Sequence, residues 1–170
     1  MQSSNNINQS DFYLGIDPGL NRTGYAVIER TRTGPCLKEA GVVRSTQKES
    51  LAVRVAEIGT GIREVIEEFQ PAMLAIEQVF SFGKNPKTAI LMAHARGAIL
   101  MMAAEQKVPV IHYTPTQIKR LLTGSGHASK EQIQSAIKME FGMKSILKPN
   151  DAADAAAIAL CLYHSVKFAA

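Results

Sequence analysis

The segment LGIDPGLNRTGYAVIE, Leu14 to Glu29, is the most informative part of the sequence. Its first apolar run ends at Asp17, and Pro18-Gly19, a pair typical of turns, follows at once. A second strand-like segment covers Thr23 to Glu29. The stretch predicts two strands joined by a turn, with a carboxylate closing the first. Because aspartate is a poor strand former and costly to bury, Asp17 is either a turn residue or a functional acid.

The segments next to this stretch predict a third strand and a helix. The first strand is expected around residues 13–16, and the third over residues 38–45, after the turn formers Gly34-Pro35. These three strands form an antiparallel meander. Apolar residues then recur at steps of three or four over residues 51–69, which indicates an amphipathic helix.

Later segments alternate between strand and helix, which indicates parallel strands. The apolar runs MLAIEQ (residues 73–78) and VPVIHY (residues 108–113) are predicted strands, with a helix over about 88–106 between them. The sequence therefore predicts an α/β fold with a mixed five-stranded sheet, flanked by helices.

Three further helices are predicted in the last third of the chain. Thr114 with Gln117, and Ser129 with Gln132, have the spacing of a capping box. An alanine-rich helix begins near Asn150 or Asp151. We expect one domain over residues 12–170, behind a flexible polar tail over residues 1–11.

Composition and charge favour a soluble domain with a polyanionic partner. The 170 residues are 46% hydrophobic and 20% charged, which is ordinary for a globular protein, and the formal net charge is +4. Residues 84–148 carry ten Lys or Arg against three Glu. This imbalance indicates a phosphate-facing surface or, alternatively, a solvated basic face.

Nothing in the sequence resembles a secretory signal or a membrane span. The longest apolar run is interrupted by His94 and Arg96, and the polar start has no basic region followed by an apolar one. Cys36 and Cys161 lie far apart and match no metal-ligand spacing, so both are expected to be reduced thiols. We expect a cytoplasmic protein.

Four acids stand at the ends of predicted elements. Glu77, like Asp17, closes an apolar strand, and ligands gather at the carboxyl ends of such strands. Asp151 and Asp154 are three residues apart, so both can project from one face of the first turn of the last helix. A purely structural role, capping free amides there, is the alternative. As a set, the four carboxylates would repel one another unless cations offset their charge.

An all-oxygen set without paired His or Cys favours Mg²⁺ or Mn²⁺ over zinc. Two such ions about 4 Å apart would activate a water and stabilise the leaving 3′ oxygen of an in-line displacement. The predicted chemistry is phosphodiester hydrolysis.

The sequence resembles the RuvC Holliday junction resolvases, a branch of the RNase H-like nucleases. The resemblance lies in ordered motifs between residue 14 and about residue 164: GIDPGLNRTGYAVIE, AIEQVF, HARGAI, YTPTQIKRLLTGSGHASKEQIQ and DAADAAAIA. It implies an RNase H-like fold in which Asp17, Glu77, Asp151 and Asp154 are the metal-binding acids. It also implies a homodimer that makes paired, symmetric nicks in four-way junction DNA, and partnership with the RuvA-RuvB branch-migration complex.

Basic and aromatic residues near the predicted site have proposed DNA contacts. By the resemblance, Lys119 and Lys130 match basic positions at the active site, although Lys119 could instead lie on a wet helix face. Phe80 matches a ring that stacks on unpaired bases, whereas Phe82 is expected in the core. Further backbone contacts are assigned to Lys84, Lys87 and Arg120. The four histidines, His94, His112, His127 and His164, are expected to be structural or surface residues, with His127 near DNA.

Three rival functions are compatible with parts of the sequence. GIDPG also resembles the first phosphate loop of sugar kinases and actin-like proteins, but the chain is short for their two lobes and has no second Gly-rich phosphate-binding segment. A DNA-binding module without catalysis would not need all four acids. A related RNase H-like nuclease could act on another branched or hybrid substrate.

Overall fold

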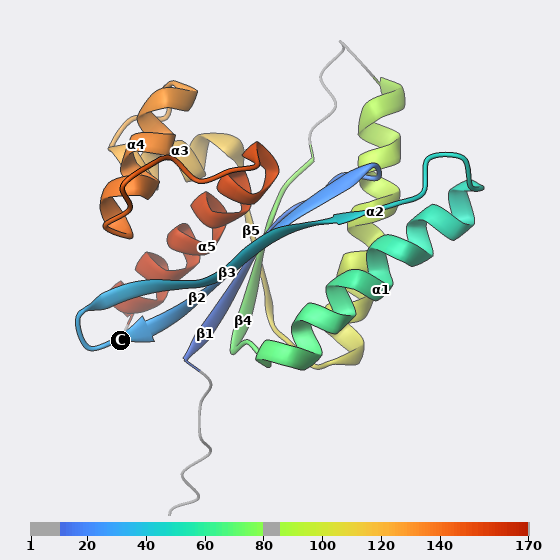
Figure 1. Cartoon of the computed structure of the whole chain (residues 1–170), viewed down its shortest axis with the longest axis horizontal. Helices are drawn as coiled ribbons and strands as arrows, with labels where there is room; N and C mark the ends of the chain where they lie inside the picture. Colours follow the sequence, from blue (N-terminus) through green and yellow to red (C-terminus); the bar gives the residue numbers. More distant parts are fainter. Residues whose placement is uncertain (1–10, 80–85, 170) are drawn as a thin grey trace, which may run out of the picture.

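A computed structural model describes residues 11–79 and 86–169, and shows one sheet between two layers of helices (Figure 1). The strands are β1 (Phe12–Asp17), β2 (Arg22–Thr31), β3 (Gly34–Arg44), β4 (Met73–Glu77) and β5 (Val110–Tyr113). The helices are α1 (Leu51–Phe69), α2 (Pro86–Glu105), α3 (Pro115–Thr123), α4 (Lys130–Glu140) and α5 (Asn150–Ala169). Asp11 apart, the expected tail lies outside the described residues, and the single domain over 12–170 stays a prediction.

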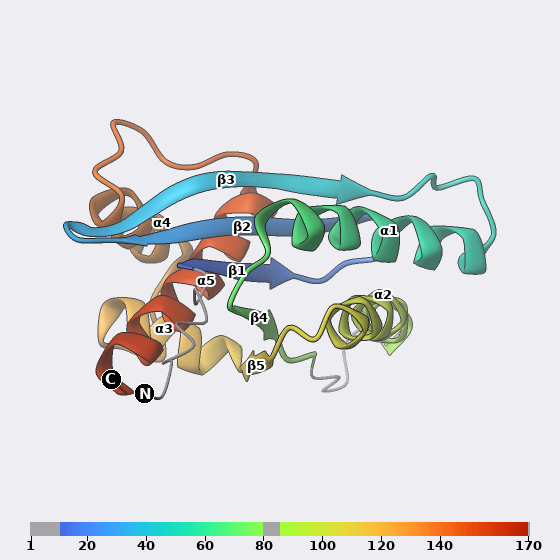
Figure 2. The ribbon, with the colours of Figure 1, turned by 90° about the horizontal axis from the view of Figure 1, so that it is seen from below.

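The sheet is mixed and has five strands in the order β3-β2-β1-β4-β5. Strands β1, β2 and β3 pair antiparallel, whereas β1–β4 and β4–β5 pair parallel. The expected RNase H-like arrangement, an antiparallel meander followed by parallel strands, is confirmed. Helix α5 packs on one face of the sheet with α3 and α4, and α1 and α2 cover the other face (Figures 1 and 2).

The prediction that Gly34-Pro35 forms the turn before the third strand was wrong. Gly34 and Pro35 lie within β3, and the hairpin turns at Arg32 and Thr33. Strand β3 is at the edge of the sheet, where a proline, which has no N–H to donate, is tolerated. The hairpin is therefore longer than expected.

Both predicted capping boxes are present and fix the starts of α3 and α4. The backbone N–H of Gln117 donates to Thr114 Oγ1 at 3.1 Å, and the N–H of Thr114 donates to Gln117 Oε1 at 2.8 Å. Ser129 and Gln132 exchange the same pair of bonds. These caps set where Lys119 and Lys130 emerge from their helices.

Helix α5 lies unusually close to the sheet because small residues face each other. A methyl group built on Gly15 in β1 would overlap the backbone carbonyl of Ala155 and lie 2.7 Å from Ala159 Cβ. The alanines along this face of α5 are buried. This close approach holds the first turn of α5, with its two acids, against the carboxyl end of β1.

Replacing Gly15 with Ala is expected to destabilise the protein by about 1–3 kcal/mol, because α5 must move off the sheet. The matched control is Gly97→Ala in α2, where a methyl would meet nothing within 4 Å. That change removes a flexible helix residue and should stabilise by about 0.5–1 kcal/mol. Urea denaturation of both variants checks this. Equal midpoints would show that α5 is not tightly packed on β1.

Candidate active site

Two of the acids lie side by side because their strands are parallel neighbours. Ile16 of β1 pairs with Ile76 of β4, so Asp17 and Glu77, the next residue in each strand, end the strands at the same edge of the sheet. Both side chains are only partly exposed. The tight turn after Asp17 is held by Thr23, whose Oγ1 donates to the Gly19 carbonyl at 2.7 Å.

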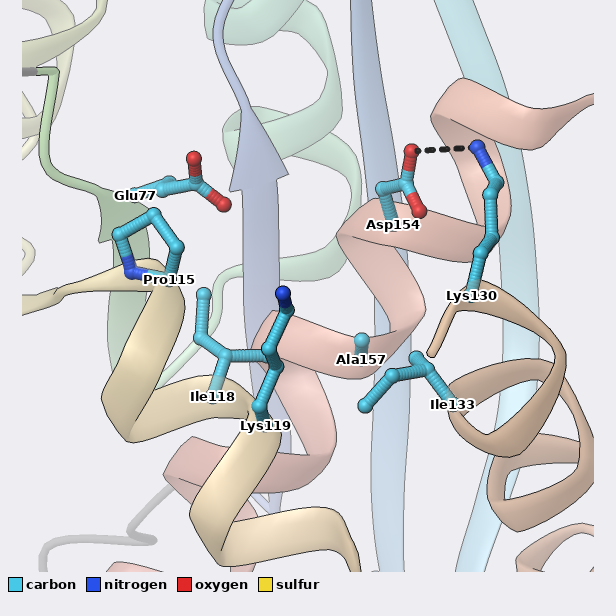
Figure 3. A pocket seen from close by; sticks show the side chains of 8 residues that line it. All are labelled: Glu77, Pro115, Ile118, Lys119, Lys130, Ile133, Asp154 and Ala157. Atoms are coloured by element: carbon cyan, nitrogen blue, oxygen red, sulfur yellow. Dashed lines mark ion pairs between the residues drawn. The ribbon is translucent and has the colours of Figure 1, made fainter. Parts of the chain in front are cut away.

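The other two acids come from the first turn of α5. Gly24 of β2 pairs with Asp17, and a methyl on Gly24 would overlap the carbonyl oxygen of Asp151. The start of α5 is therefore pressed against the strand next to Asp17. Asp154 follows one turn along the helix and faces Glu77 across a hollow (Figure 3).

Burial and mutual repulsion raise the pKa values of these acids. Burial first, and then the charges of Glu77, Asp154 and Asp151, raise the pKa of Asp17 to about 7. Burial and Asp154 raise the pKa of Glu77 to about 7, although Lys119 opposes the shift. Burial also raises the pKa of Asp154, against the effect of Lys130. The four acids thus affect one another electrostatically, which is the behaviour expected of a cluster that needs added positive charge.

The acids do not form a finished metal site as they stand. Within residues 11–79 and 86–169, no three His, Cys, Asp or Glu side chains are grouped so that they could hold an ion. Each acid of α5 is turned toward a cation instead: Asp151 Oδ2 lies 2.7 Å from Arg22 Nη2, and Asp154 Oδ2 lies 3.6 Å from Lys130 Nζ. Binding an ion would require these side chains to turn.

Two lysines border the hollow of about 220 Å³ between Glu77 and Asp154. Lys119 reaches from α3 toward the space between the two carboxylates, and Lys130 reaches Asp154 from the start of α4 (Figure 3). Lys130 stands at the positive end of a helix dipole, which disfavours a cation, and the ion pair with Asp154 offsets that cost. The hollow is therefore lined both by carboxylates and by lysine ammonium groups that can bind a phosphate.

A second hollow of about 380 Å³ opens on the other side of the acids. Asp17 and Asp151 line it, together with Arg22 and the α2 residue Thr88. The four acids are thus divided between two hollows, two to each.

Comparison with known proteins places the chain in a family. A sequence model described as "Crossover junction endodeoxyribonuclease RuvC" matches residues 13–162. The chain belongs to the RuvC family. It is 51% identical over 148 residues to the RuvC of Rhodopirellula baltica, an alignment that covers 87% of this chain and 83% of that protein.

Solved RuvC structures have the same fold as this chain. The Thermus thermophilus RuvC structure superposes with a TM-score of 0.85 at 33% identity, over 92% of this chain and 96% of that one. The same RuvC in complex with a Holliday junction substrate gives a TM-score of 0.84 over the same shares of the two chains, again at 33% identity. The fowlpox virus resolvase, at 15% identity, covers 90% of this chain and 99% of its own with a TM-score of 0.59, and shares the fold alone.

The other DNA contacts predicted from sequence are not gathered at the acids. Lys87 and Arg120 are exposed on α2 and α3, and they line neither of the two hollows. Phe80, Phe82 and Lys84 lie outside the described residues. Their predicted roles therefore stay predictions.

His94, His127 and His164 contact groups other than the four acids. His94 contacts the carbonyl of Ile90, and His164 lies 2.9 Å from Glu140. The backbone N–H of His127 donates to Ser125 Oγ. Both cysteines are free thiols, as expected. Among the described residues, no helix has the length and apolar character needed to span a membrane.

Sequence reasoning missed two arginines that contact acid-bearing segments. Arg22 pairs with Asp151, as described above. Arg96 Nε donates to the carbonyl oxygen of Glu77 at 3.3 Å, and its Nη2 donates to His112 Nδ1 at 2.7 Å, so α2 is tied to the end of β4. Burial and the nearby guanidinium lower the pKa of His112, which favours the neutral ring that can accept this bond. Arg96 lies in the motif HARGAI, which drew attention to this segment. No local sequence pattern indicated which groups Arg96 contacts.

Proposed function

We propose that this chain is a crossover junction endodeoxyribonuclease that resolves four-way DNA junctions by metal-dependent phosphodiester hydrolysis. The observation that carries the proposal is the convergence of Asp17, Glu77, Asp151 and Asp154, with Lys119 and Lys130 beside them, in a chain of the RuvC family. A relative with 33% identity is described as bound to a Holliday junction substrate.

The donor set suits a hard divalent ion. All four donors are carboxylates, and burial together with repulsion between the acids raises the pKa values of Asp17 and Glu77, a setting that an added cation would relieve. We assign the four acids as ligands of Mg²⁺, with Mn²⁺ as a substitute and two ions per site. When bound, the ions supply an activated water and stabilise the leaving 3′ oxygen of an in-line displacement.

The chain's own residues bind and orient the DNA. Once Asp154 turns away, Lys130 binds a phosphate oxygen in its place. Lys119 binds the same phosphate from α3. Arg96 fixes the end of β4 through the Glu77 carbonyl and so positions that acid. Lys84, Lys87 and Arg120 are assigned to backbone contacts farther along the strands, and Phe80 to base stacking near the crossover.

Membership of the RuvC family supports a proposal for the wider assembly. We propose a homodimer whose two sites nick opposing strands symmetrically and leave ligatable ends with 5′ phosphates. The complex would act in recombination and repair together with the RuvA-RuvB branch-migration complex, in the cytoplasm.

The decisive experiment is cleavage of synthetic DNA in Mg²⁺, with products mapped on all four strands. We expect paired, symmetric nicks in mobile and fixed four-way junctions, while linear duplex stays largely uncut. Equal cutting of linear duplex or of RNA–DNA hybrid would contradict the proposal and favour a related nuclease with another substrate.

A further inference from the structure

Arg22 is a cation beside the acids that none of the assignments above uses. Its guanidinium pairs with Asp151 at 2.7 Å, and its side chain is 42% exposed to solvent. It borders the hollow of about 380 Å³ that Asp17, Asp151 and Thr88 also line. An exposed ion pair contributes little to stability, so stability alone does not explain this arginine.

The backbone of Arg22 is held firmly, whereas its part-exposed side chain is paired with Asp151. Thr23 is fully buried and bonds both the N–H and the carbonyl of Gly19, at 3.2 and 2.7 Å. Gly24 contacts the backbone of Asp151 so closely that no side chain fits between them. Arg22 therefore stays at the mouth of the hollow whether or not it is paired with Asp151.

The two hollows are built alike. In the first, Lys130 pairs with Asp154 beside Glu77. In the second, Arg22 pairs with Asp151 beside Asp17. Each acid of α5 thus holds one cation on its own side. If that acid turned to a divalent ion, its cation would become available.

We propose that the second hollow binds a DNA phosphate adjacent to the scissile one, and that Arg22 is its ligand. This inference rests on the proposed function. The guanidinium presents paired N–H donors that match two phosphate oxygens, and Thr88 lines the same hollow. Asp17 and Asp151 would repel a phosphate as long as they carry unscreened charge. Binding at this site therefore requires divalent ions, which also release Arg22 from Asp151.

The test compares Arg22→Gln with Arg63→Gln for junction binding by gel shift in Ca²⁺, over a series of salt concentrations. Arg63 is the matched control because it is also an arginine, also 42% exposed and also paired with an acid, Glu67, but on α1. Arg22→Gln should weaken binding and reduce the slope of log affinity against log salt by about 1, whereas Arg63→Gln should match the unmodified protein.

A second arm locates the contact on the DNA. Methylphosphonate groups, which lack the phosphate charge, replace the phosphates flanking the cleavage site one at a time. The unmodified protein should lose affinity at one flanking position, and Arg22→Gln should show no further loss there, since the two changes remove the same contact.

Unchanged salt slope in Arg22→Gln, or equal methylphosphonate losses in both proteins, would overturn the inference and leave Arg22 as a partner of Asp151 only. Failure of the unmodified protein to prefer junctions over linear duplex would instead overturn the proposed function. The two failures are therefore distinguishable.

Discussion

Replacing Asp17 with Asn is expected to abolish junction cleavage while junction binding persists. Asp17 ends β1 beside Glu77 and lines the second hollow, and its carboxylate is repelled by the other three acids. A bound metal ion contributes several kcal/mol of transition-state stabilisation, and 1.36 kcal/mol is a factor of ten, so we expect cleavage to slow by about a thousandfold or more. Binding should persist or tighten, because the change removes a negative charge that faces the DNA backbone.

The measurement is single-turnover cleavage in Mg²⁺, together with gel shifts of the same junction. Glu77→Gln should behave like Asp17→Asn. Glu67→Gln, an exposed acid on α1 that pairs with Arg63, is the control and should cleave normally. If both site variants lost junction binding, these acids would be structural rather than catalytic.

Most of the fold followed from the sequence because its signals are local. Alternating apolar residues and the spacings Thr114–Gln117 and Ser129–Gln132 depend only on near neighbours, and the structure has the expected strands and helix starts. The turn before β3 was predicted at the wrong residues because the pair Gly34-Pro35 is compatible with an edge strand as well as with a turn. Whether a Gly-Pro pair turns or extends depends on which strand becomes the edge of the sheet, and that is a property of the whole topology.

The positions of the acids were predictable, but their orientations were not. The apolar runs predict that Asp17 and Glu77 each end a strand. The two acids then lie side by side because β1 and β4 are parallel neighbours. Asp151 and Asp154 were expected to project from one face of α5, yet they turn to different cations. Arg22 and Asp151 are 129 residues apart in the sequence, and Lys130 and Asp154 are 24 residues apart. No local pattern encodes contacts of these ranges.

The stability of the metal-free protein should fall as pH rises from about 4 to about 7, and Mg²⁺ should reverse this loss. The unfolded chain would ionise Asp17 and Glu77 near 3.8 and 4.5, whereas burial and repulsion raise both pKa values to about 7 in the folded protein. Between these values the folded state binds more protons than the unfolded state, so stability falls with rising pH and the loss is complete above about pH 7. Because each unit of pKa shift corresponds to about 1.4 kcal/mol, the two raised pKa values together amount to several kcal/mol, which lowers the thermal midpoint of a domain of this size by about 10 °C or more.

Thermal denaturation at pH 5 and pH 8, in EDTA and in Mg²⁺, checks this expectation. At pH 8 the acids are ionised and bind the ion, so Mg²⁺ at 100 times its dissociation constant should stabilise by about 2.7 kcal/mol. At pH 5 protons compete for the same oxygens, and the gain should largely disappear. The double variant Asp17→Asn, Glu77→Gln should lose both the pH dependence and the response to Mg²⁺, because the groups that titrate are also the proposed ligands. Midpoints in the unmodified protein that are equal at pH 5 and pH 8, and unaffected by Mg²⁺, would mean that the acids neither repel one another nor bind the ion.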